Sequence, residues 1–187
     1  MPRLAITPPS EPLRDGELWL SLPEISDIGA VAKHSRHPDM EETYWLPGKP
    51  AVTTEAAEAL IGELRQGWGG SGEHGAAFFI RRGDDLVGVV YLWKEAHGVE
   101  LGYGVAPQFR NRGVATRATR LVMDWLAPTG VPLSIRTDST NQASCRVAEK
   151  LGFKATRVDR KTTPTGEEYL ETLYEPPAPD AARRADG

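Results

Sequence analysis

The apolar and polar residues of the central stretch 98–105 alternate, which predicts a β-strand. The bulky positions are Val99, Leu101, Tyr103 and Val105, and the positions between them are Glu100, Gly102 and Gly104. A period of two is typical of a pleated strand, in which successive side chains point to opposite faces. One face is therefore bulky. The other bears a carboxylate and two glycines, which often mark a close approach to the backbone.

Apolar residues recur with the 3.6-residue period of amphipathic helices in four other stretches. The apolar stripes run from Ile25 to Ala32, from Ala57 to Trp68, from Val114 to Trp125 and from Val147 to Leu151. Pro23 suits a first helical turn, and Gly152 suits a helix end. Thr53 or Thr54 and Asn141 are good N-caps. These signals predict a helix in each of the four stretches.

Further strands are predicted on both sides of the central one. They are short apolar or alternating runs at residues 17–22, 76–81, 86–93, 133–137, 154–161 and 169–174. Three consecutive strands with short links, the last of them at Glu100, imply antiparallel pairing. The helix between the Glu100 strand and the strand at Leu133 instead implies a parallel crossover. The predicted sheet is therefore mixed.

Composition is typical of a soluble globular protein with one core, since 40% of the 187 residues are hydrophobic and 26% are charged. We expect one domain over residues 13–175, with flexible tails at 1–12 and 176–187. No apolar run approaches the ~20 residues of a membrane span, which favours a cytoplasmic protein without membrane contacts. The net charge of −4 argues against nucleic-acid binding. The absence of a Cys/His cluster with zinc spacing argues against a metal site.

A polar turn joins the central strand to the helix that follows it. The turn Arg110-Asn111-Arg112-Gly113-Val114-Ala115 lies where a strand meets a helix N-terminus. Free amides and the positive end of the helix dipole meet there, and together they stabilise an anion. Four residues between Leu101 and Met123 are charged, and all four are arginines. A solvated helix face is the alternative, but charge, glycine and position together favour an anion site.

The turn residues also match a known sequence pattern. Arg110-x-x-Gly113-x-Ala115 resembles motif A of the GNAT acyltransferase superfamily. The leader at residues 100–107, ELGYGVAP, resembles the branch that contains the RimJ- and RimL-like ribosomal-protein N-terminal acetyltransferases. The resemblance implies the α/β (α+β) GNAT fold, a mixed, mostly antiparallel sheet of about seven strands with about four helices and a splayed cofactor cleft.

The same resemblance implies acetyl-coenzyme A as the cosubstrate. The cofactor-binding residues that it implies are Val105, Arg110, Asn111, Arg112, Gly113, Val114, Ala115, Thr116, Asn141 and Ser144. Asn141 and Ser144 begin a stretch, 141–153, that resembles motif B of the family and ends in EKLGF. In the family these two residues lie beside the pantetheine arm. The backbone N–H of Val105 is expected to bond the thioester carbonyl, as in the family.

Transfer of an acetyl group to an amine requires a neutral amine, and this requirement points to a base. Glu100 shares its strand face with the two glycines and is our first candidate, while Glu171 in the last strand is the second. A structural ion pair is the alternative role for Glu100. Many family members carry a tyrosine on the motif B helix to protonate the leaving thiolate. Ala148 occupies that position here, so Ser144 is our candidate donor. Cys145 is interpreted as a buried residue, because no histidine is near it in sequence.

The acceptor half is the least informative part of the chain. Tyr44 and Trp45 lie between the first two helices, in a segment that lines the acceptor site in the family, and Tyr103 is assigned the same role. The sequence therefore predicts an N-acetyltransferase that acts by direct transfer on a protein N-terminal amine or a small-molecule amine. A homodimer is considered as its assembly. The alternative is a non-catalytic member that senses acyl-coenzyme A.

Overall fold

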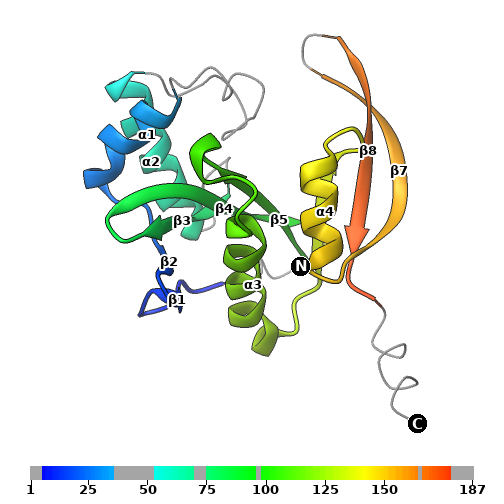
Figure 1. The fold of residues 1–187 in the computed structure, drawn as a ribbon, viewed down its shortest axis with the longest axis horizontal. Helices are drawn as coiled ribbons and strands as arrows, with labels where there is room; N and C mark the ends of the chain where they lie inside the picture. The colour runs from blue at the N-terminus through cyan, green and yellow to red at the C-terminus, as the bar shows by residue number, and fades with distance from the viewer. Residues whose placement is uncertain (1–5, 36–52, 70–74, 96–97, 164–165, 178–187) are drawn as a thin grey trace.

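The computed structural model describes residues 6–35, 53–69, 75–95, 98–163 and 166–177 (Figure 1). Its strands are β1 (Leu13–Asp15), β2 (Leu18–Ser21), β3 (Ala76–Arg82), β4 (Asp85–Glu95), β5 (Gly98–Val105), β6 (Leu133–Asp138), β7 (Lys154–Thr162) and β8 (Glu168–Glu175). Its α-helices are α1 (Ile28–Ser35), α2 (Thr54–Trp68), α3 (Val114–Leu126) and α4 (Gln142–Lys150). Short 3-10 helices lie at η1 (Ile25–Asp27), η3 (Pro107–Phe109) and η4 (Ala127–Thr129).

The described strands form one eight-stranded sheet in the order β1-β2-β3-β4-β5-β6-β8-β7. Within it β5 and β6 pair parallel across the α3 crossover, and the other neighbours pair antiparallel. The mixed, mostly antiparallel α/β sheet predicted from the sequence is confirmed. The three-residue strand β1 is an addition that the sequence analysis missed.

The two parallel strands stay together over a short distance. They pair at Val99↔Leu133 and Glu100↔Ser134, and no later pair joins the described residues of β5 and β6. β5 remains paired with β4 along its whole length, whereas β6 continues beside β8. Beyond Glu100 the sheet therefore separates into a larger part, β1 to β5, and a smaller part, β6 to β8. Figure 1 shows the β7–β8 ribbon standing away from the larger part, with α4 between them.

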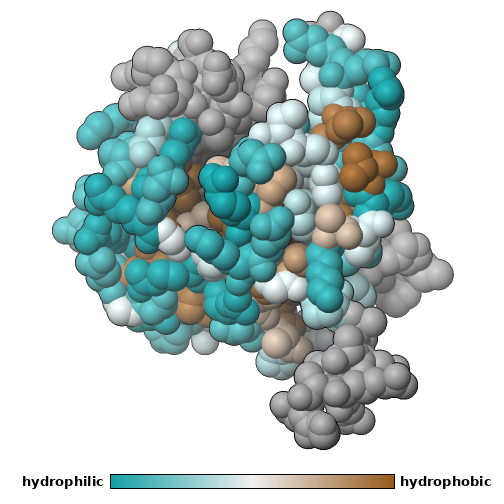
Figure 2. Space-filling model, turned by 45° about the vertical axis from the view of Figure 1, so that its right-hand side comes forward, coloured by the Kyte–Doolittle hydropathy of each residue, from teal (hydrophilic) through white to brown (hydrophobic). Residues whose placement is uncertain are grey.

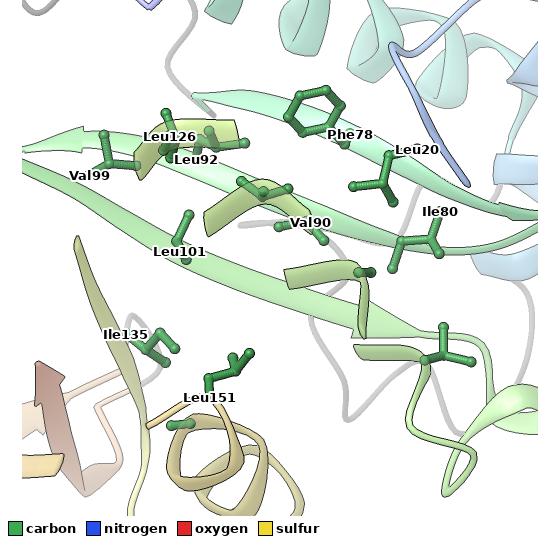
Figure 3. Packing of buried hydrophobic residues seen from close by; sticks show 14 of the residues in the cluster. Leu20, Phe78, Ile80, Val90, Leu92, Val99, Leu101, Leu126, Ile135 and Leu151 are labelled. Carbon is green, nitrogen blue, oxygen red and sulfur yellow. The ribbon is translucent and has the colours of Figure 1, made fainter. Parts of the chain in front are cut away.

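Two hydrophobic clusters cover opposite faces of the larger part. One includes alternate residues of β3, β4 and β5 with α3 and α4, and the other includes the intervening residues of β3 and β4 with α1 and α2. Figure 3 shows the first cluster extending from Leu101 of β5 to Ile135 of β6 and Leu151 after α4. These buried contacts join the two parts of the sheet near the point where the strands separate.

The ribbon of β7 and β8 presents an edge strand to solvent, since β7 is the last strand of the sheet. Figure 2 shows apolar side chains among hydrophilic ones on this ribbon, where Val158 and Leu170 are exposed. Charged side chains alternate along β7, among them Arg157, Asp159 and Lys161. Charges on an edge strand oppose pairing with another sheet.

The N-terminal region differs from the sequence-based expectation in two ways. Ile25 was assigned to the apolar stripe of the first helix, but it is 69% exposed. The reason is that residues 25–27 form η1, and α1 begins only at Ile28. Ile6 lies in the segment expected to be a loose lead-in, yet it is buried in the cluster that contains α3. The packed structure therefore begins before residue 13.

A buried ion pair anchors η1 to the sheet. The Asp27 carboxylate accepts from the N–H of Glu24 at 2.9 Å, and its other oxygen lies 2.5 Å from Nη2 of Arg81 in β3. Arg81 Nε also donates to Ser21 of β2 at 2.8 Å. The Arg81 and Asp27 side chains are 13% and 5% exposed, so this pair is largely shielded from water.

One glycine of β5 is required by packing. A Cβ atom at Gly102 would lie 2.4 Å from Cζ3 of Trp93, which is far inside van der Waals contact. The Trp93 ring stacks on Tyr91 with centroids 5.2 Å apart, and Trp93 is opposite Glu100 in the strand register. Gly102 thus lets an aromatic side chain lie flat on the sheet beside the Glu100 carboxylate, which accounts for one of the glycines noted in the sequence.

Candidate active site

A pocket of about 410 Å³ lies between the end of β5, the N-terminus of α3 and the helix α4. Of the ten residues predicted to bind the cofactor, nine line it: Val105, Arg110, Asn111, Gly113, Val114, Ala115, Thr116, Asn141 and Ser144. Arg112 is exposed and is not among the lining residues. Two motifs that are separate in sequence therefore meet around one space, although ligand binding itself stays a prediction.

The N-terminus of α3 opens into this pocket without a side-chain cap. Gly113 is the N-cap residue, with φ = 73°, and no side chain bonds the helix start there. Asn111 is also left-handed, with φ = 60°. The N–H groups of the first turn have no partner within the helix. An anion bound beside Val114 and Ala115 would be stabilised by these amides and by the helix dipole.

Three of the four arginines of this region have different partners. Arg110 lines the pocket, and its Nε donates to the carbonyl oxygen of Val105 at 3.0 Å. Arg117 pairs with Asp15 of β1 at 2.6 Å, and Arg120 donates to a carbonyl oxygen at the end of α4 at 3.2 Å. The latter two arginines therefore tie α3 to its neighbours, and Arg110 is the one that faces the pocket.

The helix α4 adds two basic residues that the sequence analysis missed. Arg146 and Lys150 both line the pocket. They are four residues apart on one helix and so share a face, which is a signal that could have been found next to motif B. With Arg110 they place cationic groups on both the α3 side and the α4 side of the pocket, as a polyphosphate ligand requires.

The outer edge of β5 offers a backbone donor to the same space. The N–H of Val99 bonds Pro132 on the β6 side, whereas the N–H of Ala106 bonds Val87 of β4. Because amides alternate in direction along a strand, the N–H of Val105 faces away from β4, toward the side that β6 has left. Its carbonyl oxygen faces the same way, since it accepts from Arg110.

Tyr103 links β5 to the first turn of α4. Its hydroxyl donates to the carbonyl oxygen of Ser144 at 2.9 Å, and burial raises its pKa. The N–H of Ser144 donates to Oδ1 of Asn141 at 3.0 Å, which confirms Asn141 as the N-cap. Tyr103, predicted to bind the acceptor, thus lies on the cofactor side of the sheet. Ala148 is fully buried in the core.

Glu100 lies on the opposite face of β5, in a network of ion pairs. Its Oε2 accepts from Nε of Arg136 in β6 at 2.7 Å, and the two side chains are 17% and 27% exposed. Arg136 Nη1 also lies 3.8 Å from Oε2 of Glu171 in β8. Burial raises the pKa of Glu100 above its ordinary value, against the lowering effect of Arg136 and with a further rise from the carboxylates of Glu95 and Glu171.

Both predicted bases are therefore joined through Arg136, a residue that the sequence analysis missed. The other predicted acceptor residues, Tyr44 and Trp45, lie outside the described residues. Cys145 is buried, as expected. The described helices include none that is long and apolar enough to cross a bilayer. In the described ranges, His, Cys, Asp and Glu form no group of three or more suited to a metal ion.

A mixed α/β sheet that splits beside an uncapped helix N-terminus, with a basic pocket on one face and two carboxylates on the other, has the splayed cleft that the resemblance to the GNAT superfamily implies. Residues 17–154 match the acetyltransferase (GNAT) domain family. The chain belongs to this family, which confirms the resemblance seen in motifs A and B.

Individual relatives agree with the family assignment. The chain is 25% identical over 157 residues to the uncharacterized N-acetyltransferase YnaD of Bacillus subtilis, covering 81% of this chain and 87% of YnaD. The ribosomal-protein-S5-alanine acetyltransferase of Vibrio fischeri is similar in fold, with a TM-score of 0.73, 17% identity and coverage of 90% and 98%. The microcin C7 self-immunity acetyltransferase MccE, solved with acetyl-CoA and AMP, has a TM-score of 0.75, 18% identity and coverage of 86% and 92%.

Proposed function

We propose that this chain transfers an acetyl group from acetyl-coenzyme A to a primary amine. The observation that carries the proposal is the split between β5 and β6. The helix N-terminus that suits an anion lies on one face of the sheet beside this split, and the Glu100 carboxylate lies on the other face. The donor and the acceptor can then approach the same point of the sheet from opposite faces.

The pocket residues fit a nucleotide-linked thioester. The uncapped N-terminus of α3 suits the pyrophosphate, and Arg110, Arg146 and Lys150 add positive charge around it. The outward N–H of Val105 supplies a donor for the thioester carbonyl, whose oxygen gains negative charge as the amine attacks.

The acceptor enters as an ammonium group and must lose a proton before it attacks. At neutral pH, deprotonation costs about 1 kcal/mol for an α-amino group and about 4.6 kcal/mol for a lysine side chain, at 1.36 kcal/mol per pKa unit. Glu100, with its raised pKa, is a stronger base than an ordinary glutamate. The proton passes to Glu100 directly or through a water, the nitrogen bonds the carbonyl carbon, and the C–S bond breaks with its electron pair on sulfur.

The thiolate leaves on the side of the pocket that contains Ser144. A thiol has an ordinary pKa of ~8.5, so the sulfur is a tolerable leaving group and needs only a hydrogen bond. Ser144 lines the pocket, and its hydroxyl is the donor we assign to this step. Because Ala148 is fully buried, the same helix has no room for a phenol at that position.

An α-amino group is the acceptor that the site suits best. Deprotonating an α-amine costs about 3.6 kcal/mol less than deprotonating a lysine, so it makes the smaller demand on a single, partly paired carboxylate. Two solved neighbours support this choice by name, since one is a ribosomal-protein-S5-alanine acetyltransferase and another is a ribosomal L7/L12 α-N-protein acetyltransferase. The acceptor is a protein N-terminus or a small molecule with an amine of similar pKa.

The test measures thiol release from acetyl-coenzyme A with a panel of peptides with free N-termini, small amines and lysine analogues. Glu100→Gln should lower turnover most at low pH, and the deficit should shrink as pH approaches the pKa of the acceptor amine. Glu168→Gln removes an exposed carboxylate of β8 and is the matched control, which should behave as wild type. Acetyl-coenzyme A binding without turnover for any amine would refute the enzyme and leave an acyl-coenzyme A sensor.

A further inference from the structure

Arg136 occupies the point where the sheet divides. The last pair between β5 and β6 joins Glu100 to Ser134, and Arg136 is two residues further along β6, on the same face. From there its guanidinium reaches back to Glu100 of the larger part and outward to Glu171 of the smaller part. One side chain thus contacts the carboxylates on both sides of the division.

The two carboxylates are equally shielded but differently bonded. Each is 17% exposed. Glu100 accepts a direct hydrogen bond from Arg136 at 2.7 Å. Glu171 has Arg136 Nη1 and Lys161 Nζ each at 3.8 Å, beyond hydrogen-bond reach, and the Tyr169 hydroxyl at a long 3.4 Å. Glu171 therefore keeps the capacity to accept hydrogen bonds from an incoming cation, whereas one oxygen of Glu100 is already held.

We propose that Arg136 is a positioning residue that divides the work of the two carboxylates, holding Glu100 as the proton acceptor and leaving Glu171 to bind the ammonium form of the acceptor. This inference rests on the acetyl transfer proposed above. Both carboxylates then act in a single reaction, and Arg136 orients them.

The charges around Glu100 show why a cation is needed there. Burial and the carboxylates of Glu95 in β4 and Glu171 in β8 oppose its ionised form. Among the described groups, the Arg136 guanidinium is the cation that favours the ionised form of Glu100. Lys161 is 3.8 Å from Glu171 instead. Without Arg136, Glu100 would hold a proton up to a higher pH and would accept one from the amine over a narrower pH range. The planar guanidinium also fixes which oxygen of Glu100 stays open to the acceptor.

Glu171 is the carboxylate that we assign to binding the ammonium form of the acceptor. An ammonium group bound at Glu171, beside the Arg136 guanidinium, gains hydrogen bonds that the two distant cations do not supply. Its proton then moves to Glu100, and water takes that proton after the products leave. The site therefore favours acceptors that arrive positively charged over neutral nucleophiles such as alcohols.

The first measurement does not depend on activity. Carboxyl ¹³C NMR titration follows Glu100 in the free protein, with its resonance assigned by its loss in Glu100→Gln. Arg136→Met should raise the pKa of Glu100, and Glu171→Gln should lower it, because the first removes a cation and the second a carboxylate. Arg160→Met removes an exposed arginine of β7 and is the control that should change nothing. An unchanged titration in Arg136→Met would overturn the proposal.

The second measurement follows kcat/KM against pH for one amine substrate. The value for each variant is divided by the value for the wild type at the same pH, so that the titration of the amine cancels. For Arg136→Met this ratio should fall about tenfold or more at acidic pH and recover at alkaline pH. Arg136→Lys should restore part of the loss, and Glu171→Gln should raise KM for the amine more than it lowers kcat. A ratio that stays constant with pH would make Arg136 merely structural and overturn the proposal.

The two measurements separate failure of this inference from failure of the proposed function. Shifted titrations of Glu100 with an inactive wild-type protein would refute acetyl transfer, and with it the catalytic assignment. Unshifted titrations in an active enzyme would refute the role of Arg136 alone. Arg136→Lys and Glu171→Gln keep the test decisive if Arg136→Met fails to fold.

Discussion

Gly113→Glu should abolish most of the affinity for acetyl-coenzyme A while the fold survives. The position has φ = 73° with no atom within 4 Å of an added Cβ, so a side chain fits but the backbone is strained. The left-handed conformation costs a non-glycine residue about 1–2 kcal/mol of stability. The new carboxylate lies at the uncapped start of α3. Two unit charges 4–8 Å apart repel by about 2–4 kcal/mol at an effective dielectric constant of ~20.

That repulsion corresponds to a loss of affinity between about 30-fold and about 1,000-fold, measured by isothermal titration calorimetry. Gly130→Glu is the matched control. Gly130 also has a positive φ of 65° and open space around its Cβ, so it adds the same charge and similar strain. It follows the far end of α3, ~20 Å away at 1.5 Å per residue, which is beyond the screening length in physiological salt. Equal affinities of the two variants would show that the phosphates bind elsewhere.

Two further changes test other parts of the structure. Ser144→Ala should slow single turnover by about tenfold or less, because it removes one hydrogen bond worth ~0.5–1.5 kcal/mol, while the dissociation constant of acetyl-coenzyme A stays constant. A drop in affinity alone would make Ser144 a binding residue. Asp27→Ala should lower the free energy of unfolding by about 3 kcal/mol in urea titrations, since it leaves the largely buried guanidinium of Arg81 without its carboxylate partner. Glu17→Ala breaks an exposed pair and should cost less than about 1 kcal/mol.

Local sequence signals predicted most of the elements. The stripe of α3, the Asn141 cap and the β3–β4 hairpin all depend on residues a few positions apart, and each is present in the structure. Of the two threonines predicted to cap α2, Thr53 is the N-cap. Most of the residues named from motifs A and B line one pocket, and their binding to the cofactor stays a prediction. The strand β1 was missed because three residues carry too little periodicity to be recognised.

The ion-pair network could not be predicted from such signals. Arg136 meets Glu100 and Glu171 through the register of three strands, and nothing within a few residues of it indicates that register. The same is true of Arg117, which was counted toward an anion site but pairs with Asp15, 102 residues earlier in the chain. Charge density in sequence therefore indicated the region of the site, while three-dimensional pairing decided which charges remain available to a ligand.

The division of the sheet has a consequence for the stability of the protein in the presence of its proposed cosubstrate. Two residue pairs join β5 to β6, and the pocket is lined by β5 and α3 on one side and by α4 on the other. A molecule bound there contacts both parts of the sheet across the short β5–β6 pairing. At a hundred times its dissociation constant, such a ligand stabilises the native state by about 2.7 kcal/mol. The lifetime of this protein in a cell would then rise and fall with the supply of acetyl-coenzyme A.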